Sequence, residues 1–385
     1  MTVQVTGINK STGAPYSATA AGNGTTDDTT VLQTAINTCG LIKLPAGTYR
    51  ITSTLTFPTY SFGGGTFVVA GGGIIGAGSG STTIKADFTN GTAIQANSSV
   101  TGHCLTHRGY KVTRVGTPTA NSYGLDIGSG TTLGVNSPDK VRLDDLILDG
   151  HYHGLRCSST GWSRVTDVIS QNNLQDGIHL VAQWQTKNVQ ALNNGNFGFY
   201  IVGVLSPNGN SMGNYRGLTA TGNGSHGAYI GGLALTVRMI DCHFNSNSGD
   251  GVYCDNTNNG VVNAFTNCTA NSNAGGIGWY FGTASGHNMM WGCQGDGQNY
   301  GVYAECVSTS IINGHFNNNT TAGIDITTGK STVYGPTLSG NGTGLIAAAA
   351  VTNITVAFTD ASGSTTPFNV ASAGGVVRTS NNPAP

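Results

Sequence analysis

Three segments of this sequence read alike: Gly251-Val252-Tyr253-Cys254-Asp255, Gly276-Ile277-Gly278-Trp279-Tyr280 and Gly301-Val302-Tyr303-Ala304-Glu305. Each begins with glycine, each has apolar residues in its second and fourth places, and successive segments start 25 residues apart. A β-strand turns alternate side chains to opposite faces, so the second and fourth places share one face and the third and fifth share the other. A pattern that returns at this interval predicts strands stacked on one another, in which single residues form columns.

The same frame extends in both directions along the chain. Its glycines are Gly124, Gly154, Gly177, Gly198, Gly227, Gly251, Gly276, Gly301, Gly323 and Gly344. The second and fourth places are apolar in nearly every copy, which predicts a core, whereas the third place is mostly polar or aromatic. Self-similarity of this period is typical of repeat architectures. The sequence therefore predicts an all-β solenoid, a parallel β-helix of about ten or more coils.

The composition limits the partners of the chain. Charged residues make up 9% of the 385 residues and the net charge is −1, whereas nucleic acids and acidic membranes require a basic excess. We therefore expect neither a nucleic acid nor a membrane as the main partner. A neutral surface rich in amides and hydroxyls suits a sugar. No apolar run is long enough to span a bilayer, and the N-terminus lacks the basic start and apolar stretch of a signal peptide.

The cysteines do not predict a disulfide framework. There are eight in a long chain, and Cys242, Cys268 and Cys293 recur at nearly the repeat interval, which predicts a buried ladder of thiols. Disulfides between neighbouring coils are the alternative. No local spacing typical of zinc, HExxH or EF-hand sites occurs, so we expect no metal and no cofactor.

The N-terminal region predicts a cap. Residues 1–22 read as an extended arm, and residues 31–36 place apolar side chains on one helical face. Thr26 or Asp27 is expected to cap this helix, with Asp28 in its first turn, and Gly40 to end it. Capping is a simpler role for these two aspartates than catalysis.

This region also resembles a known family. Gly24-Thr25-Thr26-Asp27-Asp28-Thr29, an amphipathic helix and then Leu44-Pro45-Ala46-Gly47-Thr48-Tyr49 resemble the start of the pectate-lyase-like superfamily over residues 22–51. That superfamily includes right-handed parallel β-helix domains of phage tailspikes and of polysaccharide-degrading enzymes. The resemblance implies a right-handed β-helix, an N-terminal capping helix and a polysaccharide substrate. It also implies a homotrimer that assembles with other phage tail proteins, in a virion or outside the cell. A virion-attachment domain and a trimerising domain are not recognisable.

We expect four regions. They are an N-terminal arm (1–22), the capping helix and first coil (23–51), the β-helix (52–358) and a C-terminal tail (359–385) that serves as a linker or pairs with a neighbouring subunit. The glycine-rich stretch 52–100 has no Walker lysine, so its glycines predict tight turns rather than a phosphate site. Asparagine recurs four places before the frame glycine, which predicts a ladder of hydrogen bonds between coils. Its members are Asn173, Asn194, Asn223, Asn247 and Asn319.

The outward column predicts a strip for sugar binding. Tyr200, Tyr229, Tyr253 and Tyr303 occupy the third place, spaced ~4.8 Å per coil, and Gly278 is expected to leave a gap beside Tyr280. Sugars bind on aromatic faces. The alternative is that tyrosine simply favours exposed strands.

Carboxylates lie next to this strip. Asp255 and Glu305 share the fifth place two coils apart, so their backbones are expected ~10 Å apart. Glu305 is predicted to be the general acid of a glycoside hydrolase and Asp255 to activate water, with Asp325 competing for that second role. Exposed strand ends with no catalytic role are the alternative.

A second cluster supports a different chemistry. Arg156, His179 and Asp176 lie near one another in the frame and could serve a polysaccharide lyase, which removes a proton next to a uronate. Three functions therefore stay open: a hydrolase using Glu305, Asp255 and Asp325, a lyase using a basic residue such as Arg156 or His179 with or without calcium, and a non-catalytic adhesin or tail structural protein that needs only the tyrosines.

Overall fold

The computed structural model describes residues 2–57, 72–96, 104–128, 140–203, 211–232, 235–256, 262–371 and 376–378. These residues form β-strands, almost all in parallel pairs, and one α-helix near the N-terminus. The chain divides into two compact units. Unit 1 is Met1–Gly195 with Ser206–Asn208, and unit 2 is Asn196–Leu205 with Gly209–Pro385.

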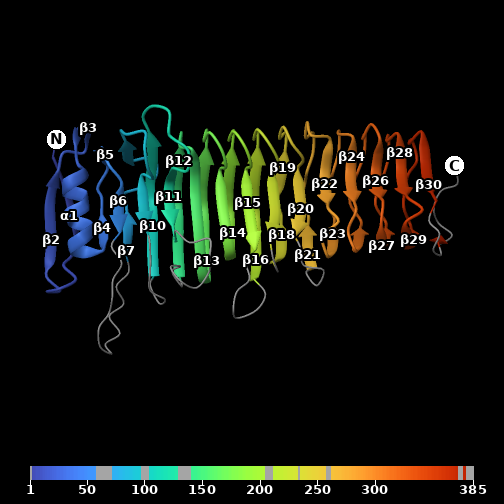
Figure 1. Ribbon diagram of the computed structural model, residues 1–385, viewed down its shortest axis with the longest axis horizontal. Coiled ribbons are helices and arrows are strands. Elements are labelled where there is room, and N and C mark those ends of the chain that lie inside the picture. Colours follow the sequence, from blue (N-terminus) through green and yellow to red (C-terminus); the bar gives the residue numbers. More distant parts are fainter. Residues whose placement is uncertain are drawn as a thin grey trace. The chain divides into compact units, whose positions relative to one another are not determined.

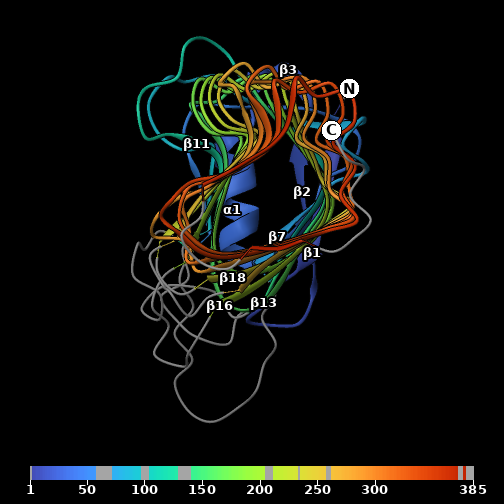
Figure 2. The same ribbon diagram turned by 90° about the vertical axis from the view of Figure 1, so that its right-hand side faces the viewer.

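Unit 1 begins with the expected cap. Helix α1 (Thr29–Cys39) buries Leu32, Ala35 and Ile36, and it packs against β1 (Val3–Ile8) and β2 (Pro15–Ala20) (Figure 2). The predicted end of the helix is confirmed, since Gly40 has a φ of 75° and donates its N–H to the Ile36 carbonyl. The arm is an antiparallel hairpin of β1 and β2, and β1 also pairs with β4 (Leu41–Lys43).

Asp28 at the start of the helix has a structural role. Asp28, rather than Thr26 or Asp27, is the N-cap residue, so its expected place in the first turn is wrong. Its buried carboxylate accepts the backbone N–H groups of Ala21 and Gly22, at 2.7 and 3.1 Å. These bonds tie the end of the hairpin to the start of the helix.

Three parallel ladders build the coils of unit 1. The first joins β6 (Leu55–Phe57), β9 (Ile94–Ala96), β11 (Tyr123–Ile127), β13 (His153–Gln171) and β14 (Ile178–Leu192). The second joins β4, β7 (Gly72–Ile75), β10 (Cys104–Arg114), β12 (Lys140–Asp149), β13 and β14. The third joins β3 (Asn23–Asp27), β5 (Gly47–Ile51), β8 (Thr82–Ala86) and the C-terminal parts of the same long strands.

Unit 2 repeats this plan. We call its first ladder the tyrosine ladder: β15 (Phe199–Gly203), β17 (Ala228–Gly232), β20 (Val252–Asn256), β22 (Ile277–Phe281), β24 (Tyr300–Ala304), β26 (Ala322–Ile326), β28 (Thr343–Ala347) and β30 (Thr366–Val370). Figure 1 shows β24, β26, β28 and β30 following one another in chain order. The parallel β-helix predicted from the repeat is confirmed.

The other sides of the unit 2 coils are one long ladder and one short one. The second ladder is β16 (Ser211–Thr221), β18 (Leu235–Ile240), β21 (Val262–Thr266), β23 (His287–Trp291), β25 (Ser308–Ile312), β27 (Gly329–Tyr334), β29 (Val351–Ala357) and β31 (Val376–Arg378). The third pairs the end of β16 with β19 (His243–Asn245) and continues as single bridges to Asp360. Pairing thus continues past Phe358, where the sequence predicted the tail to begin.

The register corrects one part of the repeat frame. Val252 pairs with Trp279, and Trp279 pairs with Val302, so the frame glycine of this coil is Gly278 and not Gly276. Frame glycines are required because a side chain there would meet the neighbouring coil: a Cβ on Gly251 would lie 2.6 Å from the Ala270 Cβ. Gly276 instead adopts a left-handed φ of 91°.

The predicted asparagine ladder is confirmed and is longer than expected. In unit 1, Asn173 donates its side-chain amide to Asn194 at 2.8 Å. In unit 2 the side-chain contacts run through Asn223, Asn247, Asn273 and Gln298, and then through Asn319 and Asn341. All these residues are buried, so the ladder satisfies polar groups inside the turns. The thiols of Cys242, Cys268 and Cys293 are also buried, and they are free.

Candidate active site

A continuous column of tyrosines lies on the outward face of the tyrosine ladder. Backbone pairing aligns Tyr200, Tyr229, Tyr253, Tyr280 and Tyr303 in adjacent strands, and we call them the tyrosine column. The expected gap at Gly278 is wrong, because the two-residue shift in register brings Tyr280 into the third place. The rings are stacked, with centroids 5.2, 5.7, 4.4 and 6.0 Å apart and planes within 20° of parallel.

This stacking changes which part of each ring a ligand can reach. A sugar inserted between two rings needs about 3.5–4 Å on each side, roughly 7 Å in all, and every spacing in the column is shorter. Phe197 also stacks on Tyr200 and Tyr229, and His226 stacks on Tyr253. The faces of the inner rings are therefore covered by aromatic neighbours. The column offers ring edges and phenol hydroxyls, not the flat platforms expected from the sequence.

The column leads directly to Glu305. The hydroxyl of Tyr280 donates to one carboxylate oxygen at 2.8 Å, and that of Tyr303 donates to the other at 3.3 Å. Burial raises the pKa of Tyr280, and the hydrogen bond and charge of Glu305 raise it further. Both phenols therefore stay protonated at neutral pH and hold the carboxylate in a fixed orientation.

Asp325 occupies the next position of the same column. It pairs with Tyr303 across adjacent strands, and only 8% of its surface is exposed. Burial raises the pKa of Asp325 to about 6, and the nearby charge of Glu305 contributes in the same direction. Asp325 therefore has the raised pKa that favours a general acid, the role that the sequence predicted for Glu305.

Asp255 leans toward the same end of the column. Gly282 lies in the coil between Asp255 and Glu305, and a Cβ on Gly282 would be 2.8 Å from Asp255 Oδ1. The Asp255 carboxylate thus reaches the level of the next coil, into space that is open only because residue 282 is glycine. This brings the carboxylate closer to Glu305 than the Asp255 backbone is. Burial raises the pKa of Tyr253, and the charge of Asp255 adds to this shift.

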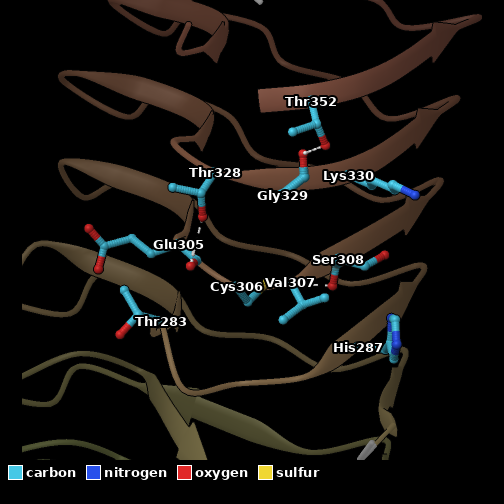
Figure 3. Close-up of a pocket in the computed structure, with 10 residues that line it drawn as sticks. All are labelled: Thr283, His287, Glu305, Cys306, Val307, Ser308, Thr328, Gly329, Lys330 and Thr352. Atoms are coloured by element: carbon cyan, nitrogen blue, oxygen red, sulfur yellow. Dashed lines mark hydrogen bonds between the residues drawn. The ribbon is translucent and has the colours of Figure 1, made fainter. Parts of the chain in front are cut away.

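A pocket of 590 Å³ borders Glu305 on its other side. Its wall includes Thr283, His287, Ser308, Thr328 and Lys330 (Figure 3). The backbone carbonyl of Glu305 accepts a hydrogen bond from the Thr328 hydroxyl at 2.8 Å, while its carboxylate points away from Lys330 and His287. The pocket is therefore formed by the turns that leave the tyrosine ladder and by the first residues of the second-ladder strands. The Glu305 carboxylate lies on the side of the tyrosine column.

In unit 1 the same outward place holds Asp126, Arg156 and His179 in successive strands. Arg156 makes two hydrogen bonds to the buried Asp126, at 2.8 and 2.6 Å, and its guanidinium lies 4.4 Å from the centre of the Tyr123 ring. Burial lowers the pKa of Arg156, but the hydrogen bonds and charges of Asp126 and Tyr123 together raise it above its ordinary value. The cation is engaged by a partner that sequence reasoning missed, although Asp126 stands in the third place one coil earlier.

The residues of the predicted second cluster, Arg156, His179 and Asp176, lie close together. Burial lowers the pKa of His179 to about 4, and the charge of Asp176 opposes this shift. Nδ1 of His153 lies 3.2 Å from the Asp176 carboxylate and accepts the Asp176 backbone N–H. At neutral pH the cluster therefore combines a neutral His179 imidazole with an arginine that is already bound to Asp126.

The described residues contain no group of three or more His, Cys, Asp or Glu that could hold a metal ion. Nor does the described part of the chain include a helix with the length and apolar character of a membrane span.

Solved structures share this fold. The A-module of the Azotobacter vinelandii mannuronan C-5 epimerase AlgE4 aligns with 94% of this chain and 98% of its own, at a TM-score of 0.60 and 16% identity. The AlgE6 A-module aligns similarly, at a TM-score of 0.61 and 16% identity, over 94% of this chain and 97% of its own. Tailspike protein 3 of bacteriophage CBA120 aligns with 98% of this chain and 65% of its own, at a TM-score of 0.51 and 13% identity. No protein-family model and no curated protein matches the sequence. At these identities the likeness confirms the right-handed parallel β-helix predicted from the N-terminal resemblance.

Proposed function

We propose that this protein binds a polysaccharide along the tyrosine column and hydrolyses it at Glu305 and Asp325, as a tailspike-like depolymerase of a bacterial surface glycan. One observation carries the proposal: five stacked tyrosines end at two acidic residues, and two of their hydroxyls hold one of the carboxylates. A row of hydroxyls beside paired carboxylates can bind a sugar chain and cleave it.

The two carboxylates have different environments, which favours different roles. Asp325, with a pKa of about 6, keeps its proton in a useful fraction near neutral pH and is suited to protonate the glycosidic oxygen. Glu305, fixed by two phenols, is suited to activate water. The strand spacing and two residues along the strand place their Cα atoms about 8 Å apart, compatible with the 6.5–9.5 Å carboxyl separation of inverting enzymes. Asp255 is the alternative base.

Fold likeness adds support of a general kind. The similar structures include a mannuronan epimerase module and a phage tailspike, so this fold is used by proteins with polysaccharide substrates and by proteins of the virion. Function is decided by the site and not by the fold, so the proposal rests on the tyrosine column and its carboxylates.

The test measures new reducing ends in capsule and lipopolysaccharide preparations. We expect Glu305→Gln and Asp325→Asn each to lower the turnover number at least 100-fold while binding persists. Asp241→Asn is the matched control, because Asp241 is an exposed acid in a left-handed conformation that asparagine also adopts. Full activity of Glu305→Gln contradicts the proposed site. Binding without cleavage by the wild-type protein supports a glycan-binding adhesin, and unsaturated products support a lyase.

The assembly expected from the family resemblance is a further part of this proposal. The second ladder and the turn after β29 expose Met289, Trp291, Tyr334 and Phe358, each with 44–56% of its surface accessible. We propose that copies of the chain bury this face in a homotrimer at the phage tail. Light scattering should give a trimer for the wild-type protein and a smaller species for Trp291→Ser. A monomeric wild-type protein contradicts the trimer.

A further inference from the structure

The tyrosine ladder has no basic side chain. None of its strands contains Lys or Arg, and the sequence has none between Arg238 and Lys330. The same stretch contains acids at Asp241, Asp250, Asp255, Asp296, Glu305 and Asp325. A site that binds carboxylate, sulfate or phosphate groups normally supplies arginine or lysine to pair with them.

Three of these acids act on the tyrosine column. Burial is the largest cause of the raised pKa of Tyr229, Tyr253 and Tyr303. The charge of Asp255 raises the pKa of Tyr229 and Tyr253 further. The charges of Glu305 and Asp325 do the same for Tyr303. The phenol hydroxyls therefore lie within the field of these three carboxylates. That field attracts sugar O–H and N–H donors and repels anions.

The histidine beside the column does not offset this charge. Burial lowers the pKa of His226 to about 4, so its ring is uncharged at neutral pH. Its Nδ1 accepts the backbone N–H of Asp250 at 2.9 Å. The side chains of His287 and Lys330, which border the pocket next to Glu305, lie on the opposite side from its carboxylate (Figure 3).

From this charge distribution we infer that the glycan bound along the tyrosine column is uncharged: a polymer of neutral hexoses or N-acetylated amino sugars, without uronate, sulfate or phosphate groups where it contacts the column. The inference rests on the proposed function and narrows its substrate class. An anionic group within about 5 Å of an unpaired carboxylate lowers affinity roughly tenfold or more, because like charges close together repel and no cation compensates.

The experiment compares acidic polymers with their own carboxyl-reduced forms. Alginate, pectate and hyaluronan are each tested as the native polyanion and after reduction of the carboxylates to alcohols. Chitin oligosaccharides and a neutral glucan complete the panel. Reduction removes the charge and keeps the sugar backbone, so linkage and length are matched. Affinity is measured by calorimetry at 50 and 500 mM NaCl with the whole chain.

We expect the uncharged polymers to bind, and a reduced polymer to bind at least tenfold more tightly than its acidic parent at 50 mM NaCl. The difference should shrink at 500 mM NaCl, because salt screens the repulsion. The substitution Asp255→Asn should also reduce this difference in affinity between the acidic polymer and its reduced form. Tyr253→Phe, which keeps the ring stack and loses a hydroxyl, should weaken binding of the neutral ligand and so locate it on the column.

Two results overturn the inference, and they are distinguishable. If an acidic parent binds as tightly as its reduced form and Tyr253→Phe weakens it, the column binds a glycan, the proposed function stands and the charge argument is wrong. If no polymer binds, and none is shortened, the proposed function fails and the inference fails with it.

Discussion

Replacing Asp325 with asparagine should make the protein more stable and less active at the same time. Asp325 is buried, and its pKa is raised from 3.8 to about 6. Because the folded pKa lies above the unfolded one, the native state holds the proton more tightly than the unfolded chain does. Ionisation of Asp325 therefore destabilises the fold above about pH 6. The penalty shrinks between pH 6 and 4 and is absent below about pH 4.

The size of the effect follows from the shift. About two pKa units correspond to about 3 kcal/mol at pH 8. Part of this comes from the charge of Glu305, which a reoriented water or side chain can screen, so we expect a gain of about 1–3 kcal/mol for Asp325→Asn. The variant should gain nothing at pH 4, where Asp325 is already neutral in the folded protein.

Urea unfolding followed by circular dichroism at pH 8 and pH 4 measures this gain, and reducing-end release measures activity. Asp250→Asn is the matched control, because burial raises the pKa of Asp250 to about 6 as well and Asp250 lies two coils from Glu305. It should gain stability similarly and keep activity. The reasoning is refuted if Asp325→Asn gains no stability at pH 8, or gains as much at pH 4.

Three further changes test the coil architecture and the site. Gly278→Ala should lower the free energy of unfolding in urea by about 2–4 kcal/mol, because the added Cβ would overlap buried groups of the next coil. Gly80→Ala is the control: the space around Gly80 is open, so this change should alter stability by less than about 0.5 kcal/mol. Asn247→Ala should cost about 2–4 kcal/mol, because it leaves buried polar groups of two adjacent coils unpaired; a loss below 0.5 kcal/mol argues against the ladder. Tyr280→Phe should lower turnover about tenfold with little change in affinity, because it frees one oxygen of Glu305; unchanged turnover argues against this positioning role.

The repeat could be read from the sequence because its cause is local. Alternation of apolar and polar residues sets which side chains enter the core, and a fixed period sets which residues share a column. The frame failed at Gly276-Ile277-Gly278-Trp279, where two glycines, each followed by an apolar residue, allow two registers. Packing decided between them: Trp279 fits the core between Val252 and Val302, and Tyr280 then joins the column.

The candidate acids were recognised from the sequence, but their environments were not. The sequence predicted Glu305 as the general acid, but burial raises the pKa of Asp325 and so favours Asp325 for that role. Burial depends on how neighbouring coils cover a side chain, and the repeat pattern carries no information on that. The pairing of Arg156 with Asp126 was likewise missed, since a column fixes which residues are neighbours and not which of them form hydrogen bonds.

The amino-acid sequence by itself determined the parallel β-helix, its capping helix, the asparagine ladder and the row of tyrosines, because each follows from a period or from the conformational preferences of single residues. Only the tertiary structure decided that the tyrosines stack on one another and present edges and hydroxyls, that Tyr280 and Tyr303 hold Glu305, and that burial raises the pKa of Asp325 to about 6. These properties depend on distances of a few ångströms between coils and on exclusion of water, which the linear pattern does not specify.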